Sequence, residues 1–475
     1  MAAQLDYKII EAPTLKTYGS AQLDLIPQLR SLPDSQIEAM KAVAAVLPFR
    51  VSNYVTEQLI DWGTIPDDPI FQLTFPQKGM LDETDFEHVL ALVRKGASNE
   101  ELRLAARAIQ YRLNPHPAGQ MELNVPLLGG QKMQGMQHKY KETVLFFPAA
   151  GQTCFAYCTY CFRWPQFVGI DELKFADNDA GRLVAYLKKH NEVQSVLITG
   201  GDPLVMRAGL LRRYLEPLVN PELAHVTSIR IGTKALAYWP YRFTSDADAD
   251  DLLRLFSQVV DSGRHLALMA HYSHPRELET AVSKQAVRRV QSTGAVIRAQ
   301  APCIRHVNDD PGVWARMWAL EVQQGIVPYY MFVERDTGAK RYFELPLARV
   351  LDIYQKAYAQ VTGLGRTVRG PSMSATPGKV LIDGVAEVAG EKVFVLKMIQ
   401  GRNPAWVNRI FFARYDRAAT WLDDLRPAFG EREFFFQAEL QRMKDLGNAQ
   451  VWYEQEQQDG ITALVPSAAY LSNSA

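Results

Sequence analysis

Three cysteines lie close together in a spacing that suits metal chemistry. Cys154, Cys158 and Cys161 follow a C-x3-C-x2-C pattern, and Cys303 is the remaining cysteine of the chain. A structural zinc site normally takes four ligands, and a redox pair needs C-x-x-C alone. Three thiolates without an obvious fourth suit a [4Fe–4S] cluster with one iron left open. Packing cysteines, or a zinc knuckle completed by a histidine, stay open as alternatives.

A Gly-Gly-Asp sequence follows the next short apolar run. The run Ser195–Ile198 is followed by Thr199 and then by Gly200, Gly201 and Asp202. Glycines have no side chain and let a backbone approach a ligand closely. An ordinary tight turn needs the same residues, so the position beside the cysteines is what favours a binding role.

Six short apolar runs alternate with amphipathic stretches in the middle of the chain, and this predicts an α/β fold. The amphipathic stretches include 180–190, Ala249–Asp261 and 311–324. Such alternation predicts parallel strands with crossover helices, in a barrel or an open sheet. Polar residues follow most runs, and the carboxyl ends of such strands carry active sites. The runs are 144–147, 195–198, 228–231, 266–269, 296–299 and 327–332.

The two ends of the chain have different patterns. The first 135 residues are expected to be mainly helical, with a capping box of Ser98 and Glu101 opening one helix. After residue 363, we expect a hairpin turn at Asp383-Gly384, a strand over 393–399 and a helix over 431–446. We therefore predict a helical region (1–135), an α/β core (136–362) and a mixed α+β module (363–475).

Composition excludes several classes of protein. Lys+Arg and Asp+Glu both number 52 in 475 residues, which argues against binding nucleic acid or a membrane surface by bulk charge. No apolar run of about 18 residues predicts a membrane span, and the N-terminus lacks the apolar region of an export signal. Few, clustered cysteines argue against a secreted disulfide scaffold, so we expect a cytoplasmic protein.

The motifs together resemble the lysine 2,3-aminomutase family of radical S-adenosylmethionine enzymes. Tyr160 precedes the third cysteine, and the Gly-Gly-Asp motif reads TGGDPL. Similarity continues in order over residues 49 to 400. The family implies a partial (β/α)6 barrel, S-adenosylmethionine bound at Gly200, Gly201, Asp202 and Gln300, and a [4Fe–4S] cluster held by the three cysteines.

The same resemblance implies a second cofactor, pyridoxal phosphate. Lys379 would carry it, with Lys139 and Tyr140 near its phosphate. Arg163 matches the family residue that binds the substrate carboxylate. The implied reaction moves an amino group between Cα and Cβ: an adenosyl radical takes a hydrogen from Cβ of an amino acid held as an aldimine. The implied partners are an amino acid substrate and a one-electron donor such as flavodoxin or ferredoxin, and a homo-oligomer is possible.

Several positions depart from the family pattern. Lys139 and Thr143 stand where the family carries phosphate-binding arginines. Arg335 and Ser372 stand where lysine-specific members carry two aspartates, so we expect a substrate other than lysine, with an anionic or neutral polar side chain. Glu334 or Asp336 could take over the ammonium site if the strand end shifts.

Further expectations follow from the same comparison of motifs. No cysteine follows Cys303, so we expect none of the zinc that lysine-type members bind at a subunit contact. Two other functions stay open, a radical S-adenosylmethionine enzyme of different chemistry without pyridoxal phosphate and a non-catalytic iron–sulfur protein. A simple electron carrier would not need the Gly-Gly-Asp motif.

Overall fold

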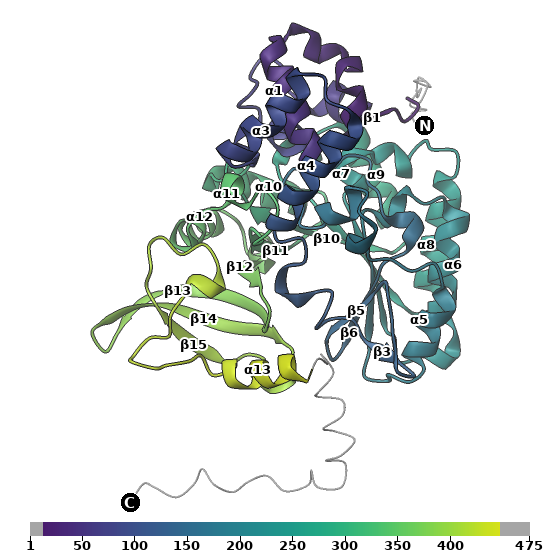
Figure 1. Ribbon diagram of the computed structural model, residues 1–475. Coiled ribbons are helices and arrows are strands. Elements are labelled where there is room, and N and C mark those ends of the chain that lie inside the picture. The colour runs from purple at the N-terminus through teal and green to yellow at the C-terminus, as the bar shows by residue number, and fades with distance from the viewer. Residues whose placement is uncertain (1–12, 447–475) are drawn as a thin grey trace, which may run out of the picture.

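One open, mixed sheet of 11 strands forms the centre of the fold in this computed structural model, which describes residues 13–446 (Figure 1). The strand order is β15-β14-β13-β12-β11-β10-β9-β8-β7-β6-β5, and β6 to β12 run parallel to one another. Antiparallel strands flank this block, β5 on one side and β13–β15 on the other. The strands are β5 (Met136–Tyr140), β6 (Thr143–Phe146), β7 (Ser195–Ile198), β8 (Ser228–Thr233), β9 (His265–His271), β10 (Val296–Cys303), β11 (Val327–Val333), β12 (Arg369–Ser374), β13 (Gly378–Val388), β14 (Glu391–Gly401) and β15 (Ile410–Arg414).

Helices connect and cover the parallel strands. Figure 1 shows α5, α6 and α8 along one side of the sheet, with α10 to α12 near the opposite end. They are α5 (Ala180–Leu187), α6 (Ala208–Leu215), α7 (Ala235–Tyr238), α8 (Ala249–Asp261), α9 (Ala281–Gln291), α10 (Pro311–Gln323), α11 (Lys340–Phe343) and α12 (Leu347–Ala359). No helix of the described part is both long and apolar enough to cross a membrane.

The N-terminal helices gather at one end of the molecule, at the top of Figure 1. The predicted capping box is confirmed, since Ser98 Oγ accepts from the backbone N–H of Glu101 at the start of α4. The helices are α1 (Asp34–Val46), α2 (Pro69–Thr74), α3 (Glu83–Arg94) and α4 (Asn99–Arg112). The strand β1 (Thr17–Gly19) pairs with β2 (Arg50–Ser52) beside them. A second short pair, β3 (Leu127–Leu128) with β4 (Gln131–Lys132), lies instead near β5 and β6 at the bottom of Figure 1.

All six apolar runs form strands, and a seventh parallel strand was missed. β12 contains Gly370-Pro371, a pair that usually marks a turn, but pairing with β11 holds it in the sheet. The predicted hairpin turn at Asp383-Gly384 is wrong. These residues lie inside β13, where the pairing with β14 shifts register between Ile382 and Gly384. The chain turns at Ala389-Gly390 instead.

The C-terminal elements also differ from expectation in length. The strand expected over 393–399 is the centre of β14, whereas the final helix is α13 (Gln437–Asp445), shorter than 431–446. The phenylalanines before it do not join the helix because they pack as a cluster, with Phe411 lying 5.4 Å from Phe434 and 5.7 Å from Phe436 between ring centroids.

The two ends of the parallel block approach each other. Lys139 on β5 donates to the carbonyl of Ala375 after β12, and Gln400 Nε2 on β14 donates to Glu142 Oε1 at 3.3 Å. Residues near the start of β6 therefore meet residues from the opposite flank of the sheet, after β12 and on β14.

Candidate active site

A cavity of about 250 Å3 lies at the carboxyl ends of the parallel strands, as the strand-end polar residues predicted. Its lining comes from β6 and the loop after it, and from the ends of β7 to β12. It brings together nine of the predicted site residues: Cys154, Cys158, Cys161, Arg163, Gly200, Gly201, Asp202, Gln300 and Arg335.

The three cysteines line this cavity as free thiols. Burial raises the pKa of each thiol, to about 12 for Cys161. Among residues 13–446, no three His, Cys, Asp or Glu side chains are placed to hold a single metal ion. A cluster places each thiolate on its own iron, and three thiolates around one cavity match that donor set.

The glycines of the Gly-Gly-Asp motif are needed for close packing of the protein itself. Gly200 has φ of +150°, and a Cβ there would lie 2.2 Å from the side chain of Gln152. At Gly201 a Cβ would lie 2.5 Å from the carbonyl oxygen of Thr153, directly before the first cysteine. These glycines therefore let the residues after β7 pack closely against the loop that carries the cysteines.

Asp202 is 2% exposed and its carboxylate is held by the protein. Oδ1 accepts from the backbone N–H of Leu204 at 2.9 Å, and Oδ2 accepts from that of Lys234 at 2.8 Å. The hydroxyl of Thr233 reaches both oxygens at 2.8 Å. Burial raises the pKa of Asp202 despite these bonds. The carboxylate thus ties the ends of β7 and β8 together at the cavity.

Gln300 and His271 form a hydrogen-bonded pair in the cavity wall. Gln300 Nε2 lies 2.9 Å from His271 Nε2. Burial, helped by the charges of Lys234 and Arg163, lowers the pKa of His271 to about 3, so the neutral ring accepts from the amide.

Arg163 and Arg335 reach the cavity as cations. Arg163 lies over the ring of Phe147, 4.1 Å from its centroid, and burial lowers its pKa to about 9. Arg335 Nε lies 3.8 Å from Asp336 Oδ1, too far for a hydrogen bond. Within the described residues, Arg335 Nε, Asp336 Oδ1 and Ser372 Oγ are buried without a hydrogen-bond partner.

Lys379 lies beside this cavity, not in its lining. Its ammonium is 4.2 Å from the ring centroid of Tyr330 and 5.4 Å from that of Phe332, a cavity residue. Burial and the nearby cations Arg230 and Arg369 lower its pKa to about 7. A substantial fraction of the amine is therefore neutral near pH 7, as a nucleophilic lysine requires.

Lys139 and Tyr140 also lie outside the lining, next to Arg402. Lys139 donates to the carbonyl of Ala375, and Arg402 Nε donates to the next carbonyl, Thr376, at 2.8 Å. Burial, together with the charges of Arg402, Arg335 and Lys379, holds the pKa of Lys139 well below its usual range. Two basic side chains are thus fixed on the turn that leads to Lys379.

Sequence reasoning assigned no role to two further residues of this region and missed a third. Lys234 follows β8 and His271 ends β9, so both belong to the polar residues noted at the strand ends, but neither was assigned to the site. Arg402 had no such signal. It is 1% exposed, and its partners include Leu123 O and Asn124 Oδ1, far away in the sequence.

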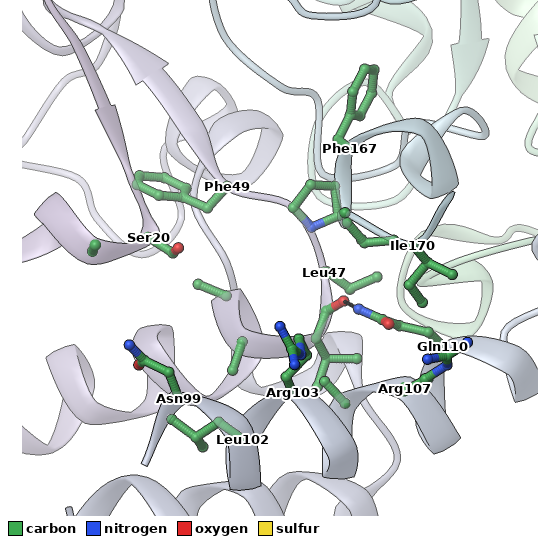
Figure 2. A pocket seen from close by; sticks show the side chains of 18 of the residues that line it. Ser20, Leu47, Phe49, Asn99, Leu102, Arg103, Arg107, Gln110, Phe167 and Ile170 are labelled. Atoms are coloured by element: carbon green, nitrogen blue, oxygen red, sulfur yellow. Dashed lines mark hydrogen bonds between the residues drawn. The ribbon is translucent and has the colours of Figure 1, made fainter. Parts of the chain in front are cut away.

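A larger hollow of about 740 Å3 lies between α1, α4 and residues 167–172 (Figure 2). Tyr157 and Phe167, stacked with centroids 4.3 Å apart, line both this hollow and the cysteine cavity. Figure 2 shows Phe49 and Phe167 across the hollow from Arg103 and Arg107. Three of its cations are ion-paired: Lys41 with Asp24, Arg103 with Glu100 and Arg107 with Glu172.

Comparisons with known proteins point to one family. A putative L-lysine 2,3-aminomutase of Aquifex aeolicus is 28% identical over 396 residues, covering 83% of this chain and 92% of that protein. The L-lysine 2,3-aminomutase of Methanococcus maripaludis is 26% identical over 48% of this chain and 49% of its own length. The glutamate 2,3-aminomutase of Clostridioides difficile is 24% identical, over 44% and 47%.

Solved structures and family models add little to this assignment. SuiB of Streptococcus suis bound to S-adenosylmethionine matches with a TM-score of 0.33 and 13% identity, covering 58% of this chain and 62% of that one, too low to support an argument. No family model matches. At 24–28% identity, the chain is similar to lysine and glutamate 2,3-aminomutases, and these relatives support a radical S-adenosylmethionine isomerase of the lysine 2,3-aminomutase type.

Proposed function

We propose that this enzyme moves an amino group between Cα and Cβ of an α-amino acid with an anionic or neutral polar side chain. It would use a [4Fe–4S] cluster, S-adenosylmethionine and pyridoxal phosphate. Relatives named lysine and glutamate 2,3-aminomutase support the reaction type. The finer fold expectation, a partial (β/α)6 barrel, is part of this proposal and is supported by the approach of the two ends of the parallel block.

The observation that carries the proposal is a group of basic side chains that form no ion pair with a carboxylate. Among the described residues, Arg163, Arg230, Arg369 and Lys379 are half-buried and Arg402 is 1% exposed, and none of them has a carboxylate within ion-pair distance. Glu142 acts on Arg230 and Lys379 only from a longer distance. Isolated buried charges are costly, so such a group favours anionic ligands. A phosphate and the carboxylates of an amino acid would supply these charges.

The cysteine side of the cavity fits the first cofactor pair. Cys154, Cys158 and Cys161 would hold three irons, and the fourth iron would take S-adenosylmethionine against Gly200, Gly201, Asp202 and Gln300. Bound there, this pair supplies a carbon radical that removes a hydrogen atom from the substrate. The protein aligns the reactants and excludes water.

The basic side chains beside the cavity, Lys139, Lys379 and Arg402, fit pyridoxal phosphate. Lys379 would form the covalent attachment, Lys139 and Arg402 would bind the phosphate, and Tyr140 would lie beside them. Arg402 would replace the charge that the family carries at the position of Thr143. Bound there, the cofactor supplies a conjugated system that stabilises an unpaired electron next to the migrating nitrogen.

The substrate would be held at both ends by arginine. Arg163 would bind the α-carboxylate, since a guanidinium can form two parallel hydrogen bonds. Arg335 lines the cavity, and its buried Nε, which lacks a hydrogen-bond partner, would donate to a side-chain carboxylate or amide. Ser372 is fully buried on β12 and does not line the cavity, although its hydroxyl also lacks a partner. Glu334 also lines the cavity, but burial raises its pKa well above the usual range, which disfavours its use as a fixed anion for a lysine side chain.

Anaerobic reconstitution tests the proposal. The protein should bind iron and sulfide, cleave S-adenosylmethionine to 5′-deoxyadenosine under reduction, and retain pyridoxal phosphate on Lys379 after borohydride treatment and peptide mass spectrometry. A screen of amino acids should then yield a β-amino acid. Lys379→Ala is the control for the adduct. A functional cluster with no adduct at Lys379 would favour the pyridoxal-free alternative, and a cluster that never cleaves S-adenosylmethionine would favour the non-catalytic one.

Other expectations stay predictions. They are the division of the chain at residues 135 and 362, an external one-electron donor, a cytoplasmic location, a possible homo-oligomer and the absence of a second, zinc-type metal site.

A further inference from the structure

We propose that Tyr238 raises the reduction potential of the cluster by donating a hydrogen bond to the sulfur of Cys158. This inference rests on the proposed function, because it requires the three cysteines to hold a cluster. It concerns a residue outside the predicted site, 80 positions along the chain from its partner, and it follows from one contact. The hydroxyl of Tyr238 lies 3.3 Å from Cys158 Sγ.

The direction of this hydrogen bond is fixed by chemistry. A cysteine sulfur bound to iron carries no proton, so it can only accept. A phenol hydroxyl at neutral pH has a proton to donate. In the loaded protein, the O–H of Tyr238 therefore points to the ligand sulfur.

The tyrosine is held rigidly in place. It ends α7, directly after the end of β8, and is 1% exposed. Its carbonyl accepts from Ser52 Oγ at 3.0 Å, and the ammonium of Lys234 lies 4.7 Å from its ring centroid. Lys234 is ion-paired with Glu277 at 2.7 Å, so much of its charge is compensated. The phenol is thus a neutral donor held at a fixed distance from Cys158.

A donor at this position favours the reduced cluster. Reduction adds one electron, and part of the added charge spreads onto the ligand sulfurs. Hydrogen bonds to those sulfurs strengthen as they become more negative, and such bonds are among the features that set the potentials of iron–sulfur clusters. In a buried site each such bond has a larger effect than in water. Tyr238 would therefore make it easier for an external donor to reduce this cluster.

The test is a redox titration of the reconstituted cluster followed by electron paramagnetic resonance. Tyr238→Phe keeps the ring but removes the donor. We expect about a tenfold loss in the equilibrium constant for reduction, equivalent to about 59 mV lower midpoint potential for a one-electron couple. Tyr54→Phe is the matched control. Its hydroxyl is also buried and bonded, to Thr280 Oγ1 at 2.7 Å, but outside the cysteine cavity, so it should leave the potential unchanged.

A second variant distinguishes an effect of the hydrogen bond on the reduction potential from an effect of disturbed packing. Site-specific incorporation of a fluorinated tyrosine at position 238 strengthens the donor and should raise the potential, opposite in sign to Tyr238→Phe. Damage to packing would not give shifts of opposite sign. Equal potentials in the wild type and both variants would overturn the role of Tyr238 while leaving the cluster proposal intact. Failure of the wild type to assemble any cluster would overturn both.

Discussion

The ammonium of Lys379 lies 4.2 Å from the ring centroid of Tyr330. Tyr330 stacks on Phe332 with centroids 5.0 Å apart, and Phe332 lines the cavity that contains the three cysteines. One aromatic pair therefore contacts both the amine that would attach pyridoxal phosphate and the cavity in which the radical would form. This contiguity is what a reaction needing both cofactors at one substrate requires.

The environment of Lys379 predicts an unusual pH dependence. Burial and the cations Arg230 and Arg369 lower its pKa to about 7, so the nucleophilic neutral amine should be lost only below neutral pH. The rate of adduct formation with pyridoxal phosphate, stopped with borohydride at several pH values, should rise to a plateau slightly above pH 7. Arg369→Gln removes one repelling cation and should move this midpoint upward. Arg366→Gln, at an exposed site, is the control. A midpoint near that of an ordinary lysine would contradict the prediction.

Arg402 should contribute to cofactor affinity. Lys139 and Arg402 donate to the consecutive carbonyls of Ala375 and Thr376, so both basic side chains are fixed beside the turn before Lys379. A hydrogen bond to a charged group contributes roughly 1.5–3 kcal/mol, so Arg402→Gln should weaken pyridoxal phosphate binding about 10- to 100-fold. Absorbance titration of protein lacking a cluster measures this without turnover.

Asn124→Ala is the control for a purely structural role of Arg402. Asn124 Oδ1 accepts a hydrogen bond from Arg402 Nη2. Removing the Asn124 side chain therefore weakens the contact between these two segments but leaves the arginine in place. Equal losses of affinity in Asn124→Ala and Arg402→Gln would show that Arg402 acts by holding the two segments together.

The cysteines can be tested separately from the rest of the site. Replacing Cys154, Cys158 or Cys161 by Ala should remove the iron, whereas Cys303→Ala should retain it. Cys303 is fully buried at the end of β10 and does not line the cavity. Iron and acid-labile sulfide analysis after anaerobic reconstitution measures the outcome. Stoichiometric zinc in place of iron would contradict the cluster assignment.

Local patterns were sufficient to predict the core of the fold. Buried parallel strands are continuous apolar runs, and all six such runs were found, together with the capping box at Ser98. β12 was missed because Gly370-Pro371 has local preferences opposite to its place in the sheet. The turn predicted at Asp383-Gly384 was wrong because the same residue types occur in β-bulges and in hairpin turns.

From local residue patterns alone, the cavity lining could be predicted only where it lies in short motifs; Arg163, Gln300 and Arg335, which also line the cavity, were named from the family resemblance. The cysteine and Gly-Gly-Asp motifs were found because their residues are adjacent in the sequence. Arg402 and Tyr238 depend on contacts between distant segments, with Leu123 in one case and Cys158 in the other, and no local pattern encodes such contacts. The family resemblance did not predict Arg402 or Tyr238 either, because neither residue was part of the matched motifs.

Substrate choice should follow Arg335 and Ser372. Leaving a buried ammonium unpaired costs on the order of 3–5 kcal/mol, roughly a 200- to 5,000-fold loss in affinity, so L-lysine should be a poor substrate. Amino acids with a side-chain carboxylate or amide should turn over better, because Arg335 lines the cavity and its buried Nε lacks a partner, while Ser372 offers no carboxylate for an ammonium. Arg335→Ala should raise KM for these substrates while S-adenosylmethionine cleavage without substrate stays unchanged. Efficient turnover of L-lysine would instead show that Glu334, which also lines the cavity, binds the ammonium, and Glu334→Gln should then abolish that turnover selectively.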